Sequence, residues 1–269
     1  MLRYVLGLAA IFLAIALGSY AADALTIGPS RFEVTLPPGE IAVADYYCQN
    51  ETEEDVHVKI EPEHWFKEAY IYGDLKIEDW LSFNIYEFDL KPKEIKKLKL
   101  TIKIPRNVKG EIVSQIFFST DAKGSKISAG GMIQVRLGAV LYVAIKGTEV
   151  VDGAIESIEV MKIEPPAKAD IKLGILFKNK GNVHLNPMGN VIILNTAEEK
   201  AAEFETLKGA TVHPNREGTH EAIYNGKKLV GGSYKVKISM KYGEIFGEPK
   251  TATYEANVLV DESGGITVK

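Results

Sequence analysis

Short segments in which apolar and polar residues alternate recur along nearly the whole chain, and this pattern most restricts what the chain can fold into. Such alternation places every second side chain on one face of a β-strand. Gly, Pro, Asn or Asp residues separate the segments, and long stretches with helical period are absent. We therefore predict an all-β fold of the sandwich type. The clearest segments read VHVKIE, KKLKLTIKIP, IVSQIFFST, ADIKLGILFKN, SYKVKISMKYG and ATYEANVLV.

The length of the chain predicts two such sandwiches. With 269 residues it is too long for one small β-domain. The stretch KGTEVVDG at residues 146–153 divides the part after residue 24 into two segments of similar length. Each segment is the size of one immunoglobulin-like sandwich of about 100 residues. We predict immunoglobulin-like domains at residues 25–148 and 149–262, followed by a polar tail at 263–269.

Residues 1–24 have the pattern of a secretory signal peptide. Arg3 gives a short basic start, an unbroken apolar run follows, and small residues at 19–24 form two candidate cleavage sites. The alternative is an uncleaved anchor, but the run is short for a span of ~20 residues. No later apolar run is long enough to cross a membrane, so none is predicted after signal cleavage. We predict export to the periplasm, the cell surface or the extracellular space.

Composition excludes several classes of partner and chemistry. The formal net charge is −4 and no basic stripe is visible, which argues against nucleic acid and against anionic membrane surfaces. The single cysteine, Cys48, excludes an internal disulfide and lies in a strand-like segment, so we expect it to be buried. A zincin helix, phosphate-binding loop, dinucleotide fingerprint and serine elbow are all absent. We predict a protein that is not an enzyme and uses no small-molecule cofactor.

The segment HPNREGTHE holds the one group of residues with metal-ligand spacing. Because it reads as a solvated loop with Pro and Gly, we predict no metal site there. The group consists of His213, Glu217, His220 and Glu221.

Aromatic residues are concentrated between positions 65 and 80. If exposed, they would stack on a carbohydrate or a partner chain. If buried, they would close one end of the first sandwich, and we favour this interpretation because Trp80 begins the strand-like WLSFNIYEF. The residues are Trp65, Phe66, Tyr70, Tyr72 and Trp80.

Two further patterns predict local structure. The segments FEVTLPPGEIAVADYYCQN and FDLKPKEIKKLKLTIKIP share the order aromatic, strand, proline turn, glutamate and strand, which we interpret as two hairpins of one sandwich. The segment LGILFKNKGNVHLNP predicts a strand, a turn and a second strand, with a positive φ at Gly181.

The stretch GGMIQVRLGAVLYVAIKG predicts an unusually long strand at residues 132–145, preceded by a mobile loop, STDAKGSKISAGG. Its apolar residues either face their own core or form an exposed edge that pairs with a partner chain. Gln134 and Arg136 lie on the opposite face. The apolar face carries Ile133, Val135, Leu137, Ala139, Leu141, Val143 and Ile145.

The segment after the signal peptide opens with IGPSRFEVTLPPGE, residues 27–40, an alternating strand that ends at a proline turn. Its arginine, Arg31, is either a solvated strand charge or a group that holds a ligand. The strand with its arginine, the PPGE turn, the loop before a long strand and the second sandwich together resemble the PapD-like periplasmic pilus chaperones. The resemblance covers the layout of essentially the whole mature chain.

The resemblance implies how the protein would work. In that family the last strand of the first domain lends alternating apolar residues to an unfinished pilin. An arginine of the first strand and a lysine of the last strand hold the pilin's terminal carboxylate. Arg31 matches the arginine by position, whereas the lysine has no counterpart and Arg136 is the cation in that region.

We therefore predict a chaperone-like module that binds an exported protein or pilin-like subunit through a strand edge and the interdomain cleft. The predicted contact residues are Arg31, Ile133, Val135, Arg136 and Leu137. The alternative is a structural or adhesive envelope protein whose strand edges are all satisfied internally. A third interpretation is a carbohydrate-binding or catalytic protein that uses the aromatic segment.

Overall fold

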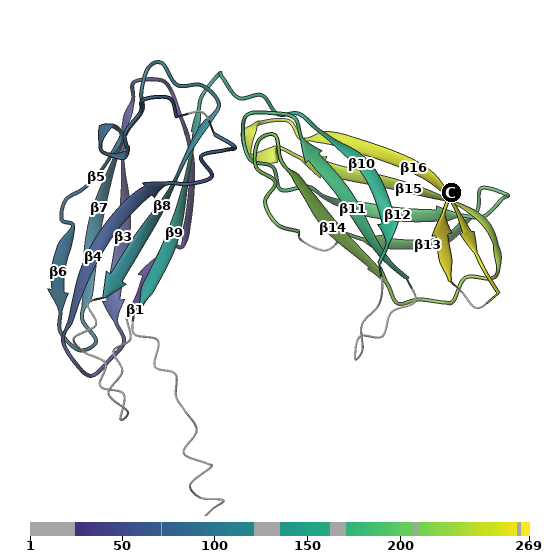
Figure 1. The fold of residues 1–269 in the computed structure, drawn as a ribbon, viewed down its shortest axis with the longest axis horizontal. Helices are drawn as coiled ribbons and strands as arrows, with labels where there is room; N and C mark the ends of the chain where they lie inside the picture. Colours follow the sequence, from purple (N-terminus) through teal and green to yellow (C-terminus); the bar gives the residue numbers. More distant parts are fainter. Residues whose placement is uncertain (1–24, 71, 121–134, 162–170, 207–208, 263–264) are drawn as a thin grey trace, which may run out of the picture.

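The computed structural model describes residues 25–70, 72–120, 135–161, 171–206, 209–262 and 265–269. The predicted signal peptide, residues 121–131 of the predicted loop and residues 132–134 of the predicted long strand, Ile133 included, lie outside the described residues. Four sheets form two β-sandwiches, which meet near one end of each with their long axes at an angle (Figure 1). The predicted fold class is therefore confirmed. No helix within the described ranges is long and apolar enough to cross a membrane.

The first sandwich packs a four-stranded sheet, in the order β1-β3-β7-β5, against a five-stranded sheet, in the order β2-β9-β8-β4-β6. Strands β2 and β9 run parallel, and the other pairs are antiparallel. One turn of 3-10 helix, η1, lies before β5. The bounds are β1 Leu25–Gly28, β2 Arg31–Leu36, β3 Ile41–Asn50, β4 Val56–His64, η1 Ile77–Asp79, β5 Leu81–Phe83, β6 Glu87–Leu90, β7 Ile95–Lys103, β8 Glu111–Thr120 and β9 Arg136–Ile145.

Two similar turns carry the chain from the five-stranded to the four-stranded sheet, at residues 37–40 and 91–94. In each turn a glutamate N–H donates to the carbonyl oxygen three residues earlier. A proline occupies the second position and a residue with positive φ, Gly39 or Lys93, occupies the third, as in a type II turn. The prediction of two hairpins is wrong, because the strands that flank each turn belong to different sheets.

The second sandwich packs a three-stranded sheet, in the order β10-β11-β14, against a five-stranded sheet, in the order β13-β12-β15-β16-β17. Residues 146–152 connect it to β9. The bounds are β10 Gly153–Val160, β11 Ile171–Asn179, β12 Met188–Leu194, β13 Lys200–Glu205, β14 Glu217–Tyr224, β15 Gly232–Tyr242, η2 Glu244–Phe246, β16 Lys250–Val260 and β17 Ile266–Val268.

Strand β17 corrects the prediction of a polar tail at residues 263–269. It pairs antiparallel with β16, and Ile266 and Val268 both pack against the second core. Two apolar residues at strand spacing are enough for a short edge strand when a neighbouring strand offers its backbone groups.

The segment after β11 differs from the predicted hairpin. It forms only an isolated bridge between Leu185 and Val212, so the predicted second strand is wrong. Gly181 does not have the predicted positive φ. A Cβ atom there would lie 2.0 Å from the carbonyl oxygen of Val150, so the position needs glycine for a close backbone approach.

The apolar face of β9 packs against its own core. Ala139, Leu141, Val143 and Ile145 are fully buried, and Leu137 is partly buried. This placement holds for the part of the predicted long strand that the structure describes. These four side chains are therefore not available to a partner chain in the folded protein.

Cys48 is fully buried in the first core, as predicted. Burial raises the pKa of its thiol to about 12, which leaves little thiolate at neutral pH. We expect the native protein to show no fast reaction with Ellman's reagent and the protein in denaturant to release one equivalent. Rapid labelling of the native protein would show that β3 opens readily.

Candidate functional site

One edge of β9 is open at its N-terminal end. Strand β9 pairs with β8 from Arg136 to Ala144, but its pairing with β2 begins only where Val140 lies opposite Arg31. Within the described part of the chain, no strand pairs with residues 136–139 on the side of β2. The first four residues of β9 thus form an edge, although the rest of the strand is central in its sheet.

The direction of the backbone groups follows from the hydrogen bonds at both ends of this edge. Thr120 donates its N–H to the carbonyl oxygen of Val135 at 2.9 Å, so odd-numbered residues bond to β8. Val140 donates its N–H to the carbonyl oxygen of Ser30 at 2.9 Å, so even-numbered residues face the side of β2. Residues alternate in this way along an antiparallel pair. The N–H and C=O groups of residues 136 and 138 therefore point to the open edge.

The predicted contact residues lie at or beside this edge, except for Ile133, which is outside the described residues. Val135 and Leu137 are half-buried, and Leu137 packs against the first core. The Arg136 guanidinium lies over the Phe117 ring, 3.5 Å from its centroid, and donates to a Glu63 carboxylate oxygen at 2.8 Å. Arg136 thus covers the outer face of β8 in the described structure.

Arg31 lies at the junction between the two sandwiches. Its Nε bonds to Glu33, its Nη1 donates to Thr211 Oγ1 at 3.1 Å, and its Nη2 lies 3.1 Å from His184 Nε2. The guanidinium also lies 4.6 Å from the centroid of the Tyr142 ring. The contacts with Thr211 and His184 reach the second sandwich. Arg31 therefore links the two domains. Binding of a partner's terminal carboxylate by Arg31 stays a prediction.

A buried ion pair forms the centre of the junction. His184, in the second sandwich, is 1% exposed and places Nδ1 2.7 Å from Glu111 Oε1. The other carboxylate oxygen of Glu111 accepts the backbone N–H of His184 at 3.0 Å. Burial alone would lower the pKa of His184, but the carboxylates of Glu111 and Glu33 outweigh it and raise that pKa. Contacts with His184 and then Arg31 lower the pKa of Glu33 to about 2 despite partial burial.

A chain of hydrogen bonds extends this centre to a second histidine. The Tyr70 hydroxyl donates to Glu111 Oε2 at 3.1 Å, and its oxygen lies 2.8 Å from His213 Nδ1. His213 is 7% exposed and contacts the rings of Trp65 and Phe66. Burial, followed by the charges of His184, Arg31 and Arg216, lowers the pKa of His213 to about 4.

The aromatic segment is largely buried, and part of it lies where the first sandwich meets the second. Tyr70 and Trp80 are 4% and 1% exposed, so the prediction of burial is confirmed for these two. Trp65, Phe66 and Tyr72 are partly buried against a small cluster around Tyr142. Part of this cluster closes the junction with the second sandwich, which the sequence did not indicate.

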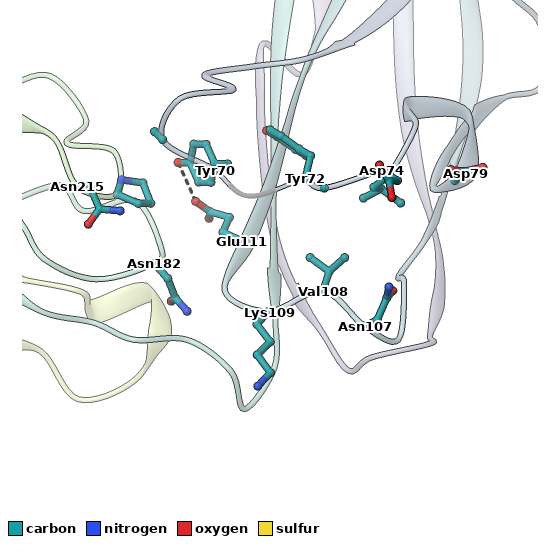
Figure 2. A pocket seen from close by; sticks show the side chains of 14 residues that line it. Tyr70, Tyr72, Asp74, Asp79, Asn107, Val108, Lys109, Glu111, Asn182 and Asn215 are labelled. Atoms are coloured by element: carbon teal, nitrogen blue, oxygen red, sulfur yellow. Dashed lines mark hydrogen bonds between the residues drawn. The ribbon is translucent and has the colours of Figure 1, made fainter.

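A cavity of about 610 Å³ lies beside the junction (Figure 2). Tyr70 and Glu111 form one wall, where their hydrogen bond is drawn, and Asn182 and Asn215 come from the second sandwich. The cavity lies where the two sandwiches meet, but none of the described residues predicted to contact a partner lines it, so partner binding in an interdomain cleft stays a prediction. Its lining is Ala69, Tyr70, Tyr72, Gly73, Asp74, Leu75, Asp79, Asn107, Val108, Lys109, Glu111, Asn182, Pro214 and Asn215.

The histidine and glutamate group of HPNREGTHE does not converge. His213 faces the junction, whereas His220 is buried in the second sandwich beside Phe177. Glu217 and Glu221 bond to lysines of β11. No cluster of three or more metal-capable side chains is found among the described residues.

Sequence reasoning missed Glu111, His184 and the junction role of His213. Glu111 precedes two apolar residues in EIVSQ, His184 lies between two apolar residues in NVHLN, and 73 positions separate them. A single ionisable residue in an apolar strand or turn is a weak signal of a buried pair, and nothing in the spacing identifies its partner.

No protein-family model and no curated protein sequence matches the chain. Solved structures of pilus chaperones are similar to it in fold. The class 5 fimbriae chaperone CfaA shares 14% identity over 86% of this chain and 98% of its own, with a TM-score of 0.48. A chain of the CsuC–CsuE complex of Acinetobacter baumannii shares 13% over 85% and 97%, with a TM-score of 0.43. A chain of the SafA pilin–SafB chaperone complex of Salmonella enterica shares 11% over 86% and 95%, with a TM-score of 0.42. The predicted resemblance to PapD-like pilus chaperones is confirmed, and at these identities it concerns the fold alone.

Proposed function

We propose that this protein is a non-enzymatic module that binds an exported polypeptide by adding a strand to the open edge of β9. The observation that supports this function is the set of backbone groups at residues 136 and 138, which point away from β8 toward a side without a described strand. Such a row of unpaired N–H and C=O groups pairs readily with an extended chain. We place this activity in the periplasm or at the cell surface.

The partner segment would pair with residues 135–138, beside Leu137 on the core side and Arg136 on the outer side. Backbone hydrogen bonds would supply affinity, and alternate side chains would supply selectivity. The fitting partner is an exported β-rich protein, such as a pilin-like subunit, that lacks a strand of its own. Arg31 is the first residue of β2 and lies where the pairing of β2 with β9 begins. Its contacts with Thr211 and His184 join the second sandwich to the first next to the open edge.

Amide exchange tests the geometry of the edge. In the isolated protein we expect the amides of Arg136 and Gly138 to exchange much faster than those of Leu137 and Ala139, because only the latter two bond to β8. A bound partner should slow the two fast amides selectively. The measurement is residue-resolved hydrogen exchange by NMR, and uniform protection of all four amides without a partner would contradict an open edge.

A pair of variants at one position tests partner binding. Gly138→Pro removes one N–H that points to the open edge and leaves the ladder with β8 intact, since proline is tolerated on the free side of an edge strand. Gly138→Ala is the matched control, because it keeps the N–H. Both variants add a Cβ atom that would lie 2.7 Å from Gln115 Nε2, the end of a flexible side chain that can move aside.

We expect the wild-type protein and Gly138→Ala to capture the same exported β-rich partner from the native envelope, and Gly138→Pro to lose it. If the folded proline variant keeps the partner, or if the wild type captures none, the structural or adhesive role is the better interpretation. That rival is favoured by the burial of the apolar face of β9 in its own core.

A further inference from the structure

The outer face of the four-stranded sheet exposes a stripe of large apolar side chains. On β3, Ile41, Val43 and Tyr47 are 61%, 59% and 41% exposed. On β7, Ile95 is 56% exposed and lies opposite Gln49, one step along the face from Tyr47. Single exposed apolar residues are common on protein surfaces, but four that share one face of a sheet form a patch.

A row of lysines borders this stripe on β7. The register places Lys103 opposite Ile41, Lys99 opposite Asp45 and Lys97 opposite Tyr47, and all three lysines are exposed. Lys99 lies 3.3 Å from the carboxylate of Asp45. Lys97 and Lys103 have no ion pair with another described residue. The face therefore carries an excess of positive charge on a chain whose formal net charge is −4.

The net charge of the chain argues against anionic membrane surfaces, but the folded sheet gathers lysines that are spread along the sequence. We propose that this face of β3 and β7 binds an anionic lipid surface, with the apolar stripe at the headgroup boundary and the lysines on lipid phosphates. Lysines beside exposed aliphatic and tyrosine side chains are typical of surfaces that lie on membranes. Lysine is depleted from protein–protein interfaces, which speaks against a protein partner on this face.

The shape of the face agrees with a broad, flat partner. The outward side chains come from two long paired strands, and the cavities at the junction and on the second sandwich are lined by other residues. A protein partner that anchors in a pocket would find none of these cavities on this face. The face belongs to the other sheet from the edge of β9, so lipid binding does not depend on the proposed strand addition.

Co-sedimentation with vesicles tests the proposal. The purified protein is mixed at low and high salt with vesicles of equimolar phosphatidylglycerol and phosphatidylcholine, or of phosphatidylcholine alone. We expect binding to the anionic vesicles that weakens with salt. Lys97→Glu with Lys103→Glu should weaken it by at least about thirty-fold, since each lysine near an anionic surface contributes about a factor of five to ten.

Two further double variants distinguish lipid binding by this face from a general effect of the net charge. Lys227→Glu with Lys228→Glu reverses the same number of exposed charges in the second sandwich and should leave binding unchanged. Ile41→Thr with Val43→Thr keeps strand propensity and should weaken binding at high salt, where the apolar contribution is larger.

The proposal is overturned if the wild type does not bind anionic vesicles at low salt, or if both lysine pairs reduce binding equally. In either case, a protein partner or another segment of this chain would be the remaining candidate to cover the apolar stripe. If the protein binds a partner strand at β9 but does not bind anionic vesicles, only the lipid-binding inference is rejected and the proposed strand addition stands.

Discussion

Replacing Glu111 with alanine is expected to lower the free energy of unfolding by about 3–5 kcal/mol. The carboxylate of Glu111 accepts hydrogen bonds from the ring and the backbone of His184 and from the hydroxyl of Tyr70, and these donors are buried. Alanine would leave three buried donors without an acceptor and His184 without its closest countercharge. Urea unfolding followed by tryptophan fluorescence would measure the loss, since Trp65 contacts the junction.

Glu63→Ala is the matched control for this variant. Glu63 also pairs with a cation, Arg136, but both side chains are exposed, so its removal should change the free energy of unfolding by less than about 1 kcal/mol. Equal losses in the two variants would mean that the ion pair at the junction contributes no more than a surface pair. An early fluorescence change in Glu111→Ala alone would indicate that the sandwiches separate before they unfold.

Acidification from pH 6.5 to pH 4 is expected to remove about 3 kcal/mol of stability through His213. Its pKa in the folded protein is about 4, below the unperturbed value of 6.5, so the unfolded chain takes up the proton first. Folding therefore loses stability as the pH falls between these two values. The raised pKa of His184 acts oppositely, and its contribution is fully present below pH 6.5 and lost as the pH rises through its folded value. Stability should thus be highest near pH ~6.5.

His213→Asn separates this effect from general acid unfolding. Asparagine keeps an N–H near the position of Nδ1, toward Tyr70, but does not titrate. We expect the free energy of unfolding of the variant to fall less steeply than that of the wild type between pH 6.5 and pH 4, with a residual slope because burial also lowers the pKa values of His64 and His220. A further decline should follow as Glu33 protonates below pH 4.5, toward its folded pKa of about 2. If the slope of the variant between pH 6.5 and pH 4 equals that of the wild type, another group causes the acid sensitivity.

The junction and the edge of β9 are neighbours, which connects these predictions to the proposed function. Arg31 begins β2 opposite Val140, two residues after the open position Gly138. Tyr142 follows on the same face of β9, and its ring contacts Arg31 and the two histidines of the second sandwich. A change in the protonation of this cluster would therefore act next to the site where a partner strand is proposed to bind.

Several features could be predicted from sequence because they depend on neighbours along the chain. The alternation in β11 placed four residues, from Ile171 to Phe177, on one face, and all four are buried. Cys48 occupies an inward position of β3 by the same periodicity. The two proline turns were recognised as equivalent, but the sheets that they connect were not, since a turn sequence does not say with which strand the next segment pairs.

The sequence by itself determined the fold class, the two sandwiches and the inward faces of the strands, because a two-residue period fixes which side chains share a face. Only the tertiary structure decided which strands became neighbours. It placed Glu111 against His184 and Arg31 against Thr211, and it set the lysines of β7 beside the apolar residues of β3. It also showed that the pairing of β2 with β9 begins only at Val140, so that no described strand pairs with the first four residues of β9 on that side. These pairings join residues tens of positions apart, and their energies depend on burial and distance, which local periodicity does not encode.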